Sequence, residues 1–448
     1  MKNIVFLHLE SVSKLILQMN RDKFPNVSSF EKRCMNYTNY YATATSTAMV
    51  LNDITYSDFY RLENTKLFGD FIETHKNAVS FVDELSDRGY RTLGIHYPAA
   101  LGNEINPGHM YAKNSDLVNY NNYEKALKDV ETTIDNAIDN DENFLIYFCN
   151  EVSHLCYADN KKFHIKNPTK RWHYGYQTID QTVGDILNIL QEKCLMDNTI
   201  IVLYGDHGDD FYGHDYNGGF CHSIEPYANI IHTPLMIYDK SIGSRVIDDV
   251  ICSLDIKQLI YNLAETGIKE KETYIYDIFH SKREYVFSRN LFAGQTPEKI
   301  NGYISNVRKS YAITTPEYSL ILTKEGWRMY IKQMDPTCNN NVLDYFYWQG
   351  GKIKHISNLD FLCVHYKSYM GHGSSGEIQR SFYKLSTILK RELKRLENET
   401  TIKEVLIHSS YSNIYYIKNM KTEFAKLKFK FIKKKTKNRL INLAWRSK

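Results

Sequence analysis

Apolar strands and amphipathic helices alternate along the first half of the chain. Residues 3–13, 143–149 and 200–204 are apolar runs rich in β-branched and aromatic side chains, which predicts strands covered on both faces. Residues 123–140 and 178–191 lie between them, and the second segment repeats apolar side chains at the i, i+4, i+7 spacing of a helix packed on a sheet. The alternation predicts an α/β domain with a mostly parallel central sheet flanked by helices.

Acidic and imidazole side chains follow two of these strands immediately. The strand at 200–204 is followed by Gly-Asp-His-Gly-Asp-Asp at 205–210, and the first strand carries Glu10 and Ser11 at its end. Open α/β sheets bind ligands at the carboxyl ends of their strands. Oxygen and nitrogen ligands together suit Zn²⁺ or Mn²⁺. An isolated Asp-His-Gly could be an ordinary polar turn, but a second strand that delivers an acid favours a metal site.

A hydroxyl-rich segment at residues 37–55 adds a third motif, which includes Thr-Ser-Thr-Ala at 45–48. With Leu-Glu-Ser at 9–11 and Asp-His-Gly at 206–208, it makes the chain resemble the sulfatase-like branch of the alkaline phosphatase superfamily. Within that branch it resembles lipoteichoic acid synthases and lipid A phosphoethanolamine transferases in particular, over about residues 1–345. It implies an alkaline-phosphatase-like α/β fold with a small C-terminal antiparallel sheet.

The resemblance also implies a set of metal ligands. Glu10 matches the first ligand of the family, and Asp206 with His207 matches the later ligand pair. Thr47 takes the position of the nucleophile and fourth ligand, whereas alignment with the lipoteichoic acid synthases selects Thr45 instead. We expect one divalent metal, Zn or Mn, and favour Thr47.

Four histidines match substrate-side positions of the family. His154 resembles the histidine of the transferases' Ser-His-Gly-Pro motif, and the resemblance implies that it binds phosphate oxygens or protonates the leaving group. His96 matches a phosphate-contacting histidine of the synthases, and His222 and His232 match positions near the headgroup. A second metal is not excluded, and Asn-Glu at 150–151 would supply its acid.

These matches predict a metal-dependent transferase. A threonine hydroxyl is a weak nucleophile until a metal or base removes its proton. We therefore expect a phosphothreonine intermediate and transfer of a phosphoethanolamine or phosphoglycerol group from a phospholipid or other headgroup donor to a glycan or glycolipid. A phosphodiesterase or sulfatase-type hydrolase is the alternative, and a non-catalytic glycan- or membrane-binding relative is a third. Residues 45–51 lack the Pro and Arg of a formylglycine motif, which disfavours sulfate ester hydrolysis.

Length and composition are those of a folded protein of 448 residues with a net charge of +4. Eight cysteines form no Cys-x-x-Cys pair, which suits a reducing compartment. No run of 18 apolar residues and no signal peptide is found, so we expect a cytoplasmic protein. We predict a catalytic core at 1–282, a small-sheet subdomain at 283–352 and a helical, basic extension at 353–448.

The end of the chain is strongly basic. Residues 421–448 carry 11 Lys and Arg against one acid, interleaved with aromatic and aliphatic side chains. This composition is typical of a segment that lies on an anionic membrane surface, and we expect peripheral attachment to the inner membrane face. Binding of nucleic acid by this segment is a less favoured hypothesis, and a solvated charged tail is the remaining alternative.

Overall fold

The computed structural model describes residues 1–59, 80–98, 116–119, 122–153, 167–210, 214, 222–267, 283–291, 309–323, 326–349, 352–355 and 375–396. Two of the predicted features, His154 and the basic segment 421–448, lie outside the described residues.

An eight-stranded sheet forms the centre of the molecule. Its strand order is β4 (Asp116–Asn119), β3 (Tyr90–Tyr97), β5 (Asn143–Asn150), β1 (Asn3–Leu9), β6 (Thr199–Gly205), β7 (Leu235–Tyr238), β2 (Met35–Tyr41) and β8 (Arg245–Cys252). Strand β7 runs antiparallel to both neighbours, and the other pairs are parallel. The predicted mostly parallel sheet is confirmed.

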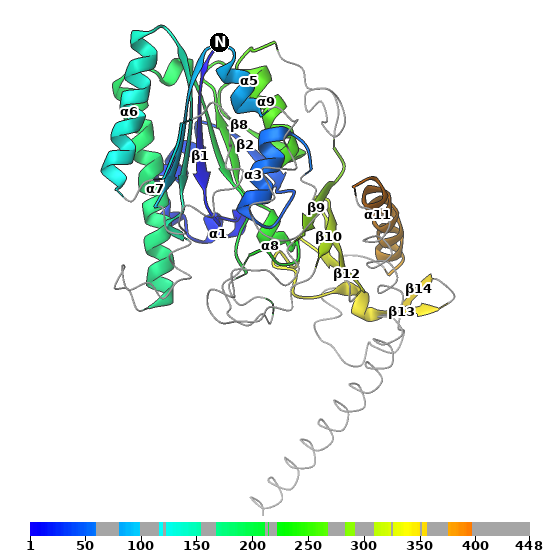
Figure 1. Cartoon of the computed structure of the whole chain (residues 1–448). Helices are drawn as coiled ribbons and strands as arrows, with labels where there is room; N and C mark the ends of the chain where they lie inside the picture. The colour runs from blue at the N-terminus through cyan, green and yellow to red at the C-terminus, as the bar shows by residue number, and fades with distance from the viewer. Residues whose placement is uncertain are drawn as a thin grey trace, which may run out of the picture.

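Helices cover both faces of this sheet (Figure 1). Helices α2 (Pro25–Glu31), α6 (Tyr123–Asp139) and α7 (Pro168–Glu192) lie on one face, and α3 (Thr47–Tyr56), α5 (Phe81–Ser86) and α9 (Ile256–Leu263) lie on the other. Strand β1 shows why both layers are needed, because Val5 and Leu7 pack toward the first layer and Ile4 and Phe6 toward the second. Its whole length is buried, as its continuous apolar sequence predicts.

A second, antiparallel sheet packs beside the core in the order β12 (Gly326–Ile331), β11 (Tyr318–Thr323), β10 (Ser310–Thr314) and β9 (Val286–Asn290). Helix α11 (Ser375–Leu396) packs on it, with the Phe382 ring centroid 5.7 Å from that of Trp327. Further along the sequence, β13 (Phe346–Gln349) and β14 (Lys352–His355) pair as an antiparallel two-stranded sheet. The small C-terminal sheet expected from the family resemblance is therefore present.

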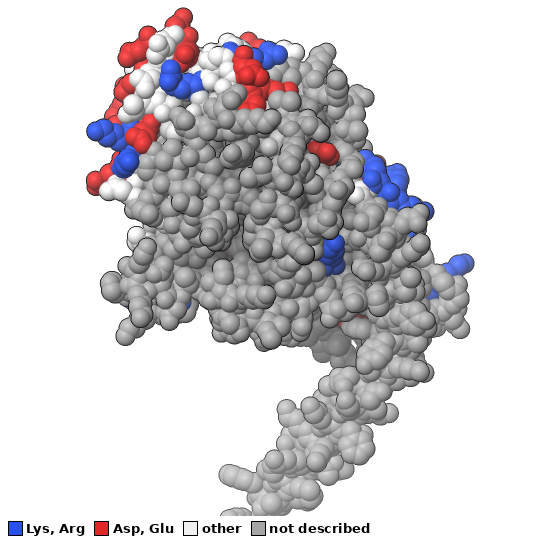
Figure 2. Space-filling view, in the orientation of Figure 1, with Lys and Arg blue, Asp and Glu red and all other residues white. Residues whose placement is uncertain are grey.

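The remaining described helices are short. They are α1 (Lys14–Met19), α8 (Ala228–Ile231) and 3₁₀ turns at Arg21–Lys23, Met196–Asn198, Ser253–Asp255 and Val342–Tyr345. No helix among the described residues is both long enough and apolar enough to cross a bilayer. Charge is unevenly spread on the face in Figure 2, where acidic side chains gather over α6 and basic ones over α11.

The first strand is shorter than the sequence predicts. It ends at Leu9 rather than Ser13, because Ser11 adopts a φ of 59° and Ser13 caps α1 by accepting a hydrogen bond from the Ile16 amide. A residue with a φ above zero does not continue a β-strand. The turn places Glu10 at the edge of the sheet.

Candidate functional site

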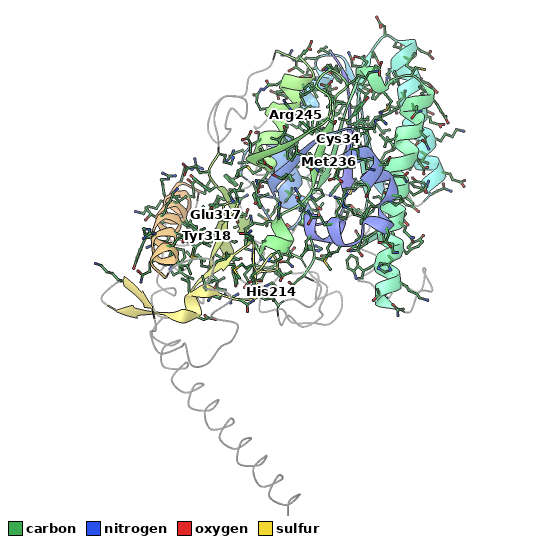
Figure 3. All side chains as sticks on the ribbon, turned by 180° about the vertical axis from the view of Figure 1, so that it is seen from behind. Cys34, His214, Met236, Arg245, Glu317 and Tyr318 are labelled. Carbon is green, nitrogen blue, oxygen red and sulfur yellow. The ribbon has the colours of Figure 1, made fainter. Side chains whose placement is uncertain are left out.

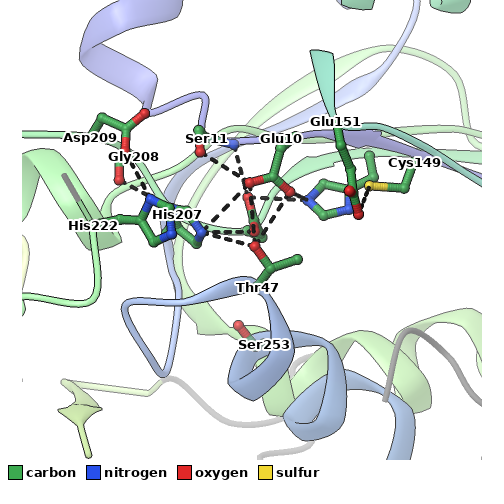
Figure 4. A network of polar contacts seen from close by, with 12 residues as sticks. Glu10, Ser11, Thr47, Cys149, Glu151, His207, Gly208, Asp209, His222 and Ser253 are labelled. Carbon is green, nitrogen blue, oxygen red and sulfur yellow. Dashed lines mark hydrogen bonds and ion pairs between the residues drawn. The ribbon is translucent and has the colours of Figure 1, made fainter. Parts of the chain in front are cut away.

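Glu10 and Asp206 follow the carboxyl ends of two neighbouring strands, and Figure 4 shows Glu10 within a network of polar contacts. In the parallel pairing of β1 with β6, Leu9 lies opposite Gly205, so the next residues are the two acids. Ser11 connects them, since its amide donates to Asp206 Oδ1 at 3.2 Å and its hydroxyl donates to Glu10 Oε1 at 3.0 Å. Both acids are fully buried.

His207 turns its Nε2 atom toward these carboxylates. Nε2 lies 3.2 Å from Asp206 Oδ2 and 3.7 Å from Glu10 Oε1, while Nδ1 donates to the Gly208 carbonyl at 3.1 Å. Burial lowers the pKa of His207, so the ring is neutral with a lone pair on Nε2. The turn requires glycine at position 208, because a Cβ there would lie 2.3 Å from the Asn229 carbonyl oxygen.

Thr47 brings a hydroxyl to the same point. It is the first residue of α3, and its Oγ1 lies 3.0 Å from His207 Nε2 and 3.3 and 3.4 Å from the two Glu10 oxygens. Thr45 is placed differently, because its buried Oγ1 has no hydrogen-bond partner among the described residues. The structure thus brings Thr47, and not Thr45, to Glu10 and His207.

We refer to Glu10, Thr47, Asp206 and His207 as the metal cluster. The ligand atoms of Glu10, Asp206 and His207 all lie within 4.8 Å of one another. Asp206 Oδ2 accepts no hydrogen bond from the described residues although it is buried. Buried carboxylates and a bare imidazole nitrogen that face one another need a cation, and bonds of about 2 Å to Zn²⁺ or Mn²⁺ would satisfy them. The residues present fit the single divalent metal predicted from the sequence.

His8 is a component of the site that the sequence reasoning missed. Its Nε2 lies 3.1 Å from Asp206 Oδ1 and 3.4 Å from Glu10 Oε2, and its Nδ1 lies 2.7 Å from the Tyr147 hydroxyl. Burial opposes the charged form, but attraction to Asp206 and Glu10 outweighs it and raises the pKa of His8. The two-residue period of a strand places His8 and Glu10 on one face, which is the signal that would have found it.

His96 lies at the same edge on β3, which β5 separates from β1. It pairs in register with Cys149, and its Nδ1 donates to Glu151 Oε1 at 2.8 Å. The ligand atoms of His96, Cys149 and Glu151 also lie within 4.8 Å of one another. Cys149 also forms such a group with His8 and Glu10. Because Cys149 belongs to both groups, Glu151, the acid considered for a second metal, lies next to the metal cluster.

His222 lies on the other side of the metal cluster. Its ring centroid is 4.3 Å from that of His207, and its Nδ1 lies 3.1 Å from Asp209 Oδ1. His232 does not join this group, because its Nε2 donates to the Thr38 carbonyl at 2.8 Å and its ring packs 4.7 Å from Tyr41. The structure therefore brings His96 and His222 to the edge that carries the metal cluster and leaves His232 elsewhere.

Comparison with known proteins gives the family and the fold of the chain. A family model described as Sulfatase matches residues 2–266, more than half of the chain. A search of curated proteins found no match. Among solved structures, the chain resembles BT4656 in complex with its substrate D-glucosamine-2-N,6-O-disulfate, with a TM-score of 0.59, 12% identity, and 88% of this chain and 98% of that chain covered.

Two further structures have the same fold. BT1596, a 2-O glycosaminoglycan sulfatase, matches with a TM-score of 0.56 and 12% identity, over 76% of this chain and 87% of that one. The lipoteichoic acid synthase LtaP from Listeria monocytogenes matches with a TM-score of 0.53 and 16% identity, over 75% of this chain and 90% of that one.

Proposed function

Because this chain belongs to the sulfatase family, we propose that it is a metal-dependent phosphotransferase that moves a phospho-alcohol group through a phosphothreonine intermediate. Its family, in the sulfatase-like branch of the alkaline phosphatase superfamily, consists of enzymes that act on sulfate or phosphate esters. The proposal adds that the substrate is a phosphate ester and that an acceptor hydroxyl takes up the phospho-alcohol group.

The observation that carries the proposal is the position of the Thr47 hydroxyl. Its Oγ1 lies 3.0 Å from His207 Nε2 and 3.3 Å from Glu10 Oε1, and the side chain is 7% exposed. A formylglycine-dependent sulfatase needs Cys or Ser at this point, whereas a threonine can only offer its hydroxyl. Thr47 also begins α3, and the positive end of a helix dipole favours a phosphate group beside it.

We assign a separate role in the first displacement to each residue of the metal cluster. Glu10, Asp206 and His207 would hold a divalent metal, with Thr47 Oγ1 as the fourth ligand, and the metal would supply Lewis-acid stabilisation and favour the ionised Thr47 hydroxyl. Thr47 Oγ1 then forms a bond to phosphorus while the bond from phosphorus to the leaving alcohol breaks. We assign protonation of the leaving oxygen to His154, which lies outside the described residues.

A second displacement completes the reaction. The acceptor hydroxyl attacks phosphorus and gives its proton to His154, which replaces the proton lost in the first step, while the bond from phosphorus to Thr47 Oγ1 breaks. We assign His96 and His222 to the phosphate oxygens in both steps. The carboxylate of Glu151 fixes the proton of His96 on Nδ1, which holds the ring in one orientation. His232 lies away from this edge, so we propose that it contacts only a headgroup that extends past the metal cluster.

Donor and acceptor are tested with one screen. Headgroup-labelled phosphatidylethanolamine and phosphatidylglycerol are incubated with the metal-loaded protein and a glycan or glycolipid acceptor, and label on the acceptor is measured. Label on the acceptor supports transfer. Release of free labelled headgroup alone supports the phosphodiesterase alternative, because water would then be the acceptor.

A sulfatase-type hydrolase is the second candidate, because two of the similar structures are a sulfatase and a complex with a disulfated glucosamine. The same protein is therefore tested with glucosamine 6-sulfate. Sulfate release without phospholipid turnover would replace the phosphotransferase proposal with the sulfatase one.

We also propose that residues 421–448 attach the enzyme to the anionic inner membrane face, where a phospholipid donor lies. The support is the local excess of 11 basic residues over one acid. Co-sedimentation with anionic and neutral vesicles compares the full chain with one ending at residue 420. Equal binding by the two chains would contradict the attachment and leave nucleic acid or protein as the partner.

A further inference from the structure

A cavity of about 500 Å³ lies between the α/β core and the small sheet. Its walls include Lys14 of α1, Asn39 and Tyr41 of β2, His232, and Tyr318 and Lys332 on the small-sheet side. None of the four residues of the metal cluster lines it. Figure 3 shows Tyr318 and its neighbour Glu317 close to α11. We refer to this space as the lysine cavity.

The two lysines are held by neutral oxygens. Lys14 Nζ donates to the carbonyls of Tyr37 at 3.0 Å and Thr38 at 2.9 Å. Lys332 Nζ donates to the Thr315 carbonyl at 2.7 Å and to the Tyr41 hydroxyl. An ammonium group has three N–H donors, so these bonds leave one donor on each lysine.

No carboxylate of the described residues lies within 4.0 Å of either ammonium group. Lys332 is only 8% exposed. A buried cation without an anionic partner costs free energy, and an anion that enters the cavity would remove that cost. The geometry alone therefore marks a place for negative charge.

The charge states of the surrounding groups agree. Burial lowers the pKa of Lys332 to about 7, with Cys338 opposing the shift and repulsion by Lys14 adding to it. Burial lowers the pKa of Lys14 to about 8, and attraction to Glu31 and Asp248 opposes that shift without cancelling it. Burial and repulsion by the same two lysines lower the pKa of His232 to about 3, so that ring stays neutral. Burial raises the pKa of Tyr41, which keeps its hydroxyl protonated.

The carboxylates that line the cavity, Glu317 and Glu377, are exposed at its edge. They do not neutralise the lysines, and no ion pair between them and either lysine is present among the described residues. The interior is thus basic and the edge acidic. This arrangement suits a ligand with an anionic group inside and hydroxyl groups outside.

We propose that the lysine cavity binds a sugar phosphate or sugar sulfate, with its oxyanion held by Lys14 and Lys332. The volume is that of a small-molecule site rather than of a bare ion. The Gln18 and Gln333 amides offer hydrogen bonds to hydroxyl groups, and Tyr318 offers an aromatic surface. The proposal stands apart from the chemistry at Thr47.

The test removes the metal cluster from the measurement. Full-length protein is treated with a chelator, so that no metal holds an oxyanion, and is titrated calorimetrically with glucose 6-phosphate, glucose 6-sulfate and glucose. One site for either ester and none for glucose is expected. Lys332→Met and Lys14→Met should each weaken ester binding at least 10-fold. No binding of either ester by the wild-type protein, or equal binding by the lysine variants, would overturn the proposal.

A matched control distinguishes binding from a structural role. Lys257 is also buried but pairs with Glu84 at 2.9 Å, so Lys257→Met should leave ester affinity unchanged. The esters should raise the unfolding temperature of the wild-type protein and of Lys257→Met but not of Lys332→Met. An equal rise in all three proteins would mean that the lysines only hold backbone carbonyls, which contradicts the proposal.

Inorganic sulfate adds a pH readout, because it does not titrate between pH 6 and 9. Binding requires both lysines to be protonated, so sulfate affinity should fall as the pH rises through the pKa of Lys332, about 7, and that of Lys14, about 8. The expected decrease approaches 10-fold per pH unit for each linked proton. His232 and Tyr41 do not change charge in this range and cannot produce the effect. A flat profile would contradict the role of Lys332.

Discussion

The metal cluster and the lysine cavity are buried polar regions of opposite sign. In the metal cluster, Glu10 and Asp206 face the neutral His207 ring, and His8, whose pKa they raise, supplies at most one positive charge for the two buried carboxylates. In the lysine cavity, two ammonium groups face carbonyl and hydroxyl oxygens and lack an anion among the described residues. Burial of unmatched charge is costly in both places, and each region is therefore built for a ligand of complementary charge.

A third buried region shows the contrast, because its charges are already matched. Arg289 is 1% exposed and lies 3.2 Å from both Asp53 oxygens, and Asp53 also accepts a hydrogen bond from the Thr43 hydroxyl at 2.6 Å. This pair supports the segment that leads to Thr47, since the Arg289 amide donates to the Thr43 carbonyl at 2.9 Å. It needs no ligand, and we expect it to affect stability rather than binding.

The largest expected effect follows from removing the nucleophile. Thr47→Ala should lower turnover by about 10⁴-fold, because no other hydroxyl of the described residues contacts both Glu10 and His207. Steady-state kinetics and circular dichroism measure activity and fold. Thr45→Ala is the matched control and should keep most of the activity. An active Thr47→Ala with an inactive Thr45→Ala would move the role to Thr45.

The acidic side of the comparison is tested by metal removal. A chelator should lower the unfolding temperature of the wild-type protein, because metal at 1,000 times its Kd contributes about 4 kcal/mol to stability. Glu10→Gln should bind metal at least about 100-fold more weakly, show little response to chelator, and contain less metal by elemental analysis. Asp210→Asn is the control, since Asp210 pairs with His214 instead. Equal metal content in wild type and Glu10→Gln would exclude Glu10 as a ligand.

The matched pair is tested by removing one charge. Asp53→Asn should lower the free energy of unfolding by about 3–5 kcal/mol, because Arg289 would remain buried without its carboxylate. Urea denaturation gives the value. The same change at Asp197, whose pair with Lys240 is exposed, should have a far smaller effect. Similar losses in the two variants would mean that burial does not set the size of the effect.

The basic side of the comparison predicts a pH dependence of stability. The pKa of Lys332 is about 7 in the folded protein, against 10.5 for an unperturbed lysine. Between these values the unfolded chain binds the extra proton, so stability from this group increases with pH, by up to about 1.4 kcal/mol per pH unit. Urea denaturation at pH 7, 8 and 9 should show this slope in wild type and a smaller slope in Lys332→Met. Parallel profiles would contradict the burial of an unmatched charge.

The sequence predicts the acidic region far better than the basic one. Two buried strands that are recognisable in the sequence lead directly to Glu10 and to Asp206 and His207. The positions at the ends of these strands and the family motifs both identify the three residues. The mostly parallel sheet and its flanking helices also follow from periodicity alone. Strand β7, which runs antiparallel, is too short at four residues for its direction to be read from the pattern.

The lysine cavity could not be predicted in this way. Lys14 and Lys332 are far apart in the sequence and belong to no motif, and only the packing of the small sheet on the core brings them together. His232 illustrates the same limit, because its motif suggested a headgroup contact and its neighbours depend on that packing. His8 is an intermediate case, since strand alternation places it under Glu10 but does not reveal its contact with Asp206.

The most direct measurement is mass spectrometry of the protein after incubation with metal and a phospholipid donor in the absence of acceptor. We predict a phospho-alcohol group on the peptide that contains Thr47, no such group after chelation, and its loss when a glycan acceptor is added. Turnover of the donor with the modification on another residue, or with Thr47 never modified, would contradict the assignment of Thr47 as the nucleophile of this site.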